Sequence, residues 1–64
     1  MVTLDHEPGE GVLTYLARAL VLSRRSGDPV GCVFNGIAFV ISPTMTDDEA
    51  HSAWLQAKRA TRAT

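Results

Sequence analysis

Two clusters that combine histidine with carboxylates are the most chemically suggestive residues of this 64-residue sequence. Asp47 and His51 stand four positions apart, which places both on one face of a helix and would suit a metal ion or a proton relay. His6 stands between Asp5 and Glu7. Neither cluster has the repeated Cys and His spacing of a structural zinc site. We therefore interpret Asp47 and His51 as a surface pair near a helix start and His6 as loop polarity, and we predict no metal.

The single cysteine, Cys32, is the next candidate for chemistry. A lone thiol cannot form an intramolecular disulfide, and a reactive thiol needs a basic group close to it. The residues around Cys32 are apolar, so we expect a buried, inert side chain. A single unpaired cysteine also fits a reducing compartment, which favours a cytoplasmic location.

Other catalytic signatures are missing from the sequence. It has no Gly-rich phosphate loop, no serine elbow and no Cys/His dyad by spacing. The residue after the initial methionine is Val2, not the proline that some very small tautomerases use for catalysis. We therefore predict that the protein is not an enzyme and needs no cofactor.

The charges are nearly balanced, with six basic and seven acidic residues and a net charge of −1. This balance argues against binding to nucleic acid, which would require a basic surface. Because a hairpin returns the chain to its starting end, we expect Arg24 and Arg25 to approach the acidic residues at 47–49. By the same reasoning, the end of the second helix approaches Glu7 and Glu10.

Composition and size indicate a small globular chain that needs partners. The apolar fraction is 45% and the charged fraction 20%, as in folded proteins. The longest apolar run, residues 12–22, contains Arg18 and is shorter than the roughly 18 residues of a membrane span. Acidic residues precede this run and Arg24 and Arg25 follow it, unlike a secretory signal. Since a chain this short buries only about 60% of its unfolded surface, we expect oligomerisation to complete the fold.

Turn and periodicity signals predict a single small domain of the α+β class, an α-β-β-α unit. Residues 1–9 are expected as a loop or arm, in which Val2 and Leu4 would at most add a short edge strand. Apolar spacing predicts a helix over 10–26 that ends at Gly27. Asn35-Gly36 predicts a two-residue turn in a hairpin over 30–41. A capping box that begins at Thr46 predicts a second helix over 47–61.

The hairpin has two apolar faces, and only one of them is bulky. A two-residue turn places Phe34 opposite Ile37 and so fixes the other pairs. The bulky face then carries Val30, Cys32, Phe34, Ile37, Phe39 and Ile41, and the flat face carries Gly31, Val33, Ala38 and Val40. We expect the bulky face to hold the chain's own helices and the flat face to lie open.

The helices add to this apolar excess. In the first, Leu13, Leu16, Ala17 and Leu20 form the expected buried side, while Tyr15 and Leu22 lie almost opposite. In the second, small residues line up with Trp54, which serves either as a core residue or as an anchor of a subunit interface. The predicted interface residues are Tyr15, Leu22, Val33, Ala38, Val40 and Trp54.

These features favour a homo-oligomeric binding module that acts on another protein, as small accessory proteins and phage-borne inhibitors or regulators do. An alternative is an oligomer that binds a small anionic ligand, such as a nucleotide, between protomers, with Arg18 or Arg25 at the ligand. A DNA-binding regulator is a third reading, which the near-neutral charge disfavours.

Overall fold

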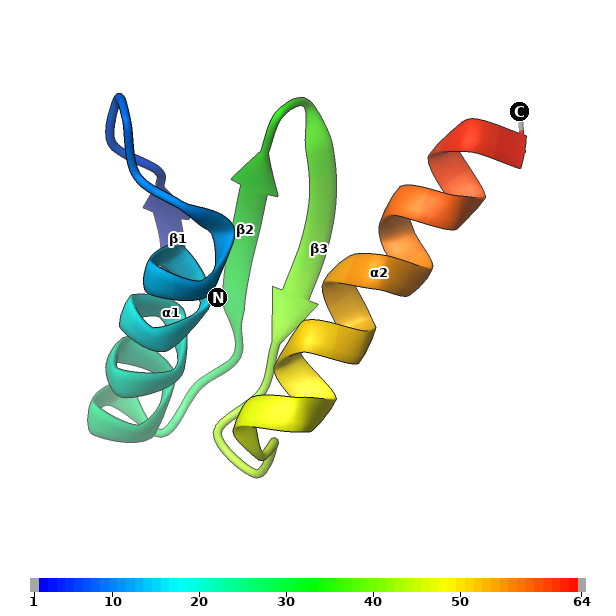
Figure 1. Cartoon of the computed structure of the whole chain (residues 1–64). Coiled ribbons are helices and arrows are strands. Elements are labelled where there is room, and N and C mark those ends of the chain that lie inside the picture. Colours follow the sequence, from blue (N-terminus) through cyan, green and yellow to red (C-terminus); the bar gives the residue numbers. More distant parts are fainter. Residues whose placement is uncertain (1, 64) are drawn as a thin grey trace.

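The computed structural model describes the backbone of residues 2–63 and the side chains of residues 2–61. Over this part of the chain the fold is α+β, with two helices and a three-stranded sheet of order β1-β2-β3. Both helices pack on the same face of the sheet (Figure 1). The elements in chain order are β1 (Val2–Asp5), α1 (Val12–Ser26), β2 (Val30–Phe34), β3 (Ile37–Ile41) and α2 (Asp47–Ala63).

The first strand corrects the predicted topology. Residues 1–9 were expected as a loop or arm in which Val2 and Leu4 could add a short edge strand. The structure has such a strand: β1 pairs in parallel with β2, with Val2 opposite Val30 and Leu4 opposite Cys32. The chain is therefore β-α-β-β-α rather than α-β-β-α, and α1 is the crossover of a parallel β1-α1-β2 unit. Four residues with only two apolar side chains carry a weak strand signal, since their stabilising partner β2 is distant in the sequence.

The hairpin of β2 and β3 has the predicted register. Phe34 pairs with Ile37, and the remaining pairs follow from it up to Val30 with Ile41. The turn residues Asn35 and Gly36 have φ of 52° and 76°. This left-handed conformation suits Asn and Gly, and its twist matches that of the flanking strands.

Helix α1 is rotated relative to the predicted orientation. Leu13, expected at the centre of the buried side, is 66% exposed, whereas Tyr15 and Ala19 are fully buried. Ser23 is also buried, and its hydroxyl is satisfied there because it donates to Asp28 O at 2.9 Å. The rotation follows from β1, since the helix covers the β1–β2 pair and inserts Tyr15 there. Gly27 ends the helix with φ 73°, and its N–H donates to Ser23 O, as predicted.

Helix α2 begins with the predicted capping box. The Glu49 N–H donates to Thr46 Oγ1 at 3.2 Å, and the Thr46 N–H donates to Glu49 Oε1 at 3.0 Å. Ala50 and Trp54 are buried against the bulky sheet face. The Phe34 and Trp54 rings meet edge to face, with centroids 6.2 Å apart. One core therefore joins both helices to one face of the sheet.

Candidate interaction surface

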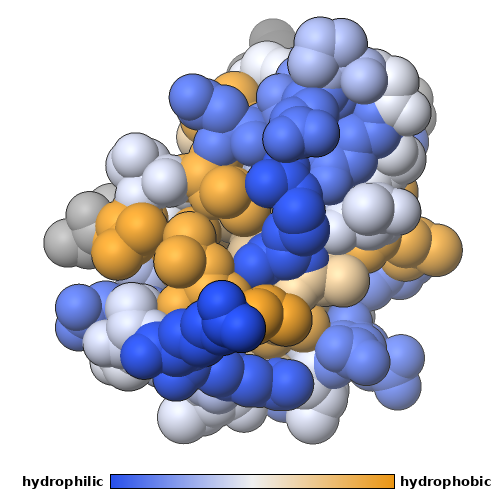
Figure 2. Space-filling model, turned by 90° about the vertical axis from the view of Figure 1, so that its left-hand side faces the viewer, coloured by the Kyte–Doolittle hydropathy of each residue, from blue (hydrophilic) through white to orange (hydrophobic). Residues whose placement is uncertain are grey.

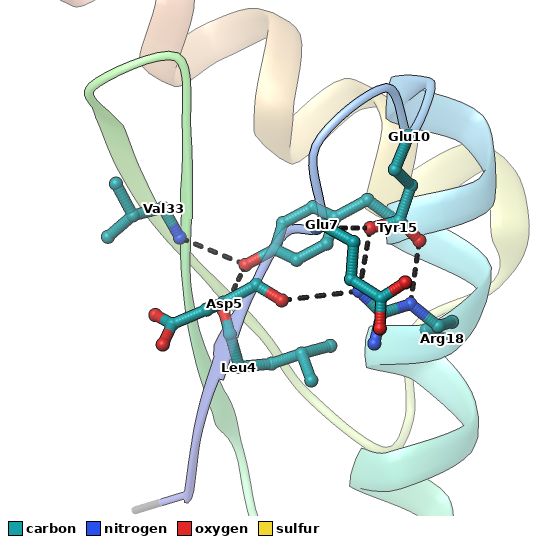
Figure 3. A network of polar contacts seen from close by, with 7 residues as sticks. All are labelled: Leu4, Asp5, Glu7, Glu10, Tyr15, Arg18 and Val33. Atoms are coloured by element: carbon teal, nitrogen blue, oxygen red, sulfur yellow. Dashed lines mark hydrogen bonds and ion pairs between the residues drawn. The ribbon is translucent and has the colours of Figure 1, made fainter.

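Tyr15 joins the end of the β1–β2 pair (Figure 3). Its hydroxyl accepts from the Val33 N–H at 3.1 Å and donates to Leu4 O. The hydroxyl therefore bridges a donor on β2 and an acceptor on β1. Burial raises the pKa of Tyr15 to about 12. The prediction of Tyr15 as an interface residue is corrected: the side chain is fully buried within its own chain.

Arg18 links the β1–α1 connection to helix α1 through hydrogen bonds. Its Nε donates to Glu10 Oε2 and its Nη2 to Glu10 Oε1, both at 2.6 Å, and Nη2 also donates to Asp5 O at 3.2 Å (Figure 3). The hydrogen bonds from Arg18, with a further one from the Glu7 N–H, lower the pKa of Glu10 to about 2. Arg18 is thus already engaged with a carboxylate, which reduces its capacity to bind an anionic ligand.

The arrangement of charges differs from the prediction in two places. Arg24 lies near the start of α2, as connectivity required, but it donates to Met45 O at 2.9 Å rather than to a carboxylate. Glu10 pairs with Arg18 of the adjoining helix α1, while the Lys58 ammonium lies 5.0 Å from the centroid of the Trp54 ring. Glu10 and Lys58 therefore do not pair with each other, and Arg24 binds a backbone carbonyl instead of a carboxylate.

The residues singled out for chemistry have packing roles. His51 stacks on Trp54, with centroids 6.1 Å apart, and His6 lies 4.9 Å from the Phe34 ring. Cys32 is buried in the core, and desolvation raises the pKa of its thiol. Among residues 2–61, no three His, Cys, Asp or Glu side chains gather as metal ligands would. Within the described chain, neither helix has the length and apolar character needed to cross a bilayer.

No helix among the described residues covers the sheet face opposite α1 and α2. We call it the open sheet face; β-strand alternation and the pairing register place on it Thr3, Asp5, Gly31, Val33, Ala38 and Val40. Val33 is 50% exposed and Val40 46% exposed. Val33, Ala38 and Val40 were predicted as interface residues, and they lie together on this surface.

A second apolar surface lies at the β1 edge of the sheet. A groove of about 460 Å³, which we call the α1–β1 groove, is lined by Leu4, Thr14, Ala17, Arg18, Val21, Leu22 and Arg25. Val21 is 51% exposed and Leu22 is half-buried. Figure 2 views the side of the molecule that carries α1 and β1, and apolar side chains gather there between strongly hydrophilic ones.

Sequence reasoning placed some residues of these surfaces and missed others. Leu22, Arg18 and Arg25 lie together in the α1–β1 groove, whereas Trp54 is buried in the chain's own core. Leu4 was named for a short edge strand but not as a surface residue, and Val21 was not among the predicted interface residues. The alternation of apolar and polar residues from Val2 to Asp5 was the available signal for Leu4.

Comparisons of this chain with protein-family models, with curated proteins and with solved structures found no match. The surfaces themselves therefore carry the functional argument.

Proposed function

We propose that this chain is a non-catalytic binding protein that works as a homo-oligomer and acts on another protein. The observation that carries the proposal is uncovered apolar surface. Val33 and Val40 are about half exposed on a sheet face with no helix over it, and Val21 and Leu13 are exposed on α1. For a chain of this size such surface favours association, because burying it removes apolar area from water at about 25 cal/mol per Å².

The reactive and ionisable side chains are engaged within the fold, which supports a binding role rather than a catalytic one. The Cys32 thiol is buried with a raised pKa, which keeps it protonated and unreactive. Tyr15 is hydrogen-bonded inside the fold and Arg18 is engaged with Glu10. These groups are used to hold the structure together.

Sedimentation velocity from micromolar to submillimolar concentration tests the self-association. We expect a species of at least twice the chain mass that dissociates on dilution. A monomer over the whole range would contradict the proposal. Val40→Lys is a useful companion variant, since a charge on the open sheet face should weaken any association that buries that face.

A small anionic ligand is the second candidate function, favoured by Arg25 at the α1–β1 groove. The engagement of Arg18 with Glu10 and the burial of Tyr15 make it the weaker candidate. A thermal-shift screen against phosphate and nucleotides tests it. Stabilisation of the wild type that is absent in Arg25→Ala would favour the ligand over self-association as the role of the groove.

A further inference from the structure

The β1 edge of the sheet has backbone groups available for pairing. The Val2 N–H donates to Pro29 O at 3.3 Å, so the backbone groups of Val2 face the neighbouring strand β2. Successive residues of a strand direct their backbone N–H and C=O groups to alternate sides, so those of Thr3 and Asp5 point away from β2. At Asp5 the carbonyl also accepts from Arg18. An edge of this kind is a template for another strand.

The α1–β1 groove lies beside this edge and adds apolar contact to it. Leu4, on the helix-facing side of β1, forms part of the groove together with Val21 and Leu22 of α1. A partner that extends the sheet past β1 therefore also covers the groove.

The charges along this surface identify the partner. Arg25 lies at the end of the groove that is next to the C-terminus of α1. Glu7 lies in the loop near Arg18, toward the other end (Figure 3). The hydrogen bond to Glu10 is the main cause of the raised pKa of Arg18, and the charge of Glu7 adds a smaller contribution. A basic group at one end and an acidic group at the other complement a copy of the same surface turned end for end. A two-fold axis perpendicular to the sheet produces this arrangement, because it makes both the strands and the helices antiparallel.

From this we infer that a second copy of this chain pairs its β1 with β1 in antiparallel fashion, so that the two α1–β1 grooves close on each other. The inference rests on the proposed self-association and specifies its surface and symmetry. The product is a continuous six-stranded sheet with all helices on one side, in which Arg25 of each copy meets Glu7 of the other.

The sequence of β1 also favours a register centred on Leu4 over one centred on Asp5. With Leu4 at the two-fold axis, Thr3 of each copy stands opposite Asp5 of the other. The Asp5 N–H donates to Thr3 O, and Asp5 O, which already accepts from Arg18, accepts from the Thr3 N–H with its second lone pair. On the open sheet face, the Thr3 hydroxyl then donates to the facing carboxylate. A register centred on Asp5 would place two like charges directly opposite each other, which is destabilising.

Charge reversal tests this dimer, because each substitution acts twice across a two-fold axis. We expect Arg25→Glu to raise the dimer dissociation constant about tenfold, and Glu7→Arg to do the same. The double variant should restore wild-type affinity, since the pair is then reversed but complementary. Arg59→Glu, on the exposed side of α2, is the matched control and should leave the dissociation constant unchanged.

A backbone test is independent of charge. Thr3→Pro removes an outward N–H and spares the bonds from β1 to β2, so it should weaken the dimer while the circular dichroism spectrum of the monomer stays native.

The outcomes separate this inference from the proposed function. Association that is lost in Val40→Lys but unchanged by Arg25→Glu and Thr3→Pro would overturn the β1-edge dimer and leave homo-oligomerisation standing. Single reversals that weaken the dimer without rescue in the double variant would also overturn the Arg25–Glu7 pairing. A wild-type monomer at every concentration would refute both.

Discussion

Replacement of Tyr15 by phenylalanine tests whether the Tyr15 hydroxyl stabilises the parallel pairing of β1 with β2. In the wild type the Tyr15 hydroxyl accepts from the Val33 N–H and donates to Leu4 O, and the side chain is fully buried. Tyr15→Phe keeps the ring and its contacts with Phe34 and Phe39 at 5.7 and 6.3 Å. The substitution therefore removes the two hydrogen bonds and little else.

The expected loss of stability follows from these two bonds. A neutral hydrogen bond contributes about 1 kcal/mol net, and a buried group left without a partner costs about 1–3 kcal/mol. We therefore expect Tyr15→Phe to lower the free energy of unfolding by about 2 kcal/mol. For a domain of this size that lowers the thermal midpoint by roughly 10 °C. Urea denaturation and amide hydrogen exchange at Val33 measure the loss and its location.

The pH dependence gives a second, independent readout. Folding raises the pKa of Tyr15 from 10 to about 12, so the native state favours the neutral phenol. This contribution to stability is complete below pH 10 and is lost as the pH rises toward 12. The wild type should therefore lose more stability than Tyr15→Phe over that window. Both proteins are compared in a Cys32→Ala background, because the thiol interacts with the Tyr15 hydroxyl and its alkaline titration would otherwise differ between them.

The chain contains one tyrosine, so the ultraviolet absorbance of tyrosinate reports this group directly. Titration of Tyr15 near pH 10 would refute the burial of its hydroxyl, since burial is the main cause of the raised pKa. A Tyr15→Phe variant with wild-type stability and an unchanged, protected Val33 amide would refute the bridging role of the hydroxyl, since β1 and β2 would then pair without it.

Three further predictions concern the loop, the cap and the thiol. Because the pKa of Glu10 is lowered from 4.5 to about 2, its contribution to stability is present above pH 4.5 and is lost as the pH falls toward 2. Glu10→Gln should therefore be less stable than the wild type at neutral pH and lose less stability between pH 4.5 and 2. A parallel decline of both proteins in thermal melts would contradict this expectation. Thr46→Ala removes the hydroxyl that accepts from the Glu49 N–H and should cost about 1 kcal/mol in urea denaturation, whereas an unchanged midpoint would show that the cap is dispensable. Native Cys32 should react with a disulfide reagent only at the rate at which the chain opens, and a fast reaction under native conditions would show that the thiol is accessible.

The hairpin and the second helix could be predicted from the sequence because their signals are local. Asn35-Gly36 sets the turn, the turn sets the register, and alternation then assigns every side chain of β2 and β3 to a face. The capping box at Thr46 likewise lies within four residues. The exposure of Val33, Ala38 and Val40 followed from the same reasoning.

The first strand and the orientation of α1 were decided by tertiary structure. β1 is stabilised by pairing with β2, which lies beyond a whole helix in the sequence, so its own four residues carry little signal. Once β1 is in place, the buried side of α1 is the side that covers the β1–β2 pair, which buries Tyr15 and exposes Leu13. The α1–β1 groove exists for the same reason.

The sequence by itself thus determined the turns, the caps, the hairpin register and the presence of more apolar surface than one layer of helices covers. Tertiary structure alone decided which side of α1 faces the sheet, where Arg18 and Tyr15 make their hydrogen bonds, and that β1 forms one edge of the sheet. The physical reason is range: a turn or cap depends on neighbours a few residues away, whereas parallel pairing depends on contacts that form only when distant segments meet.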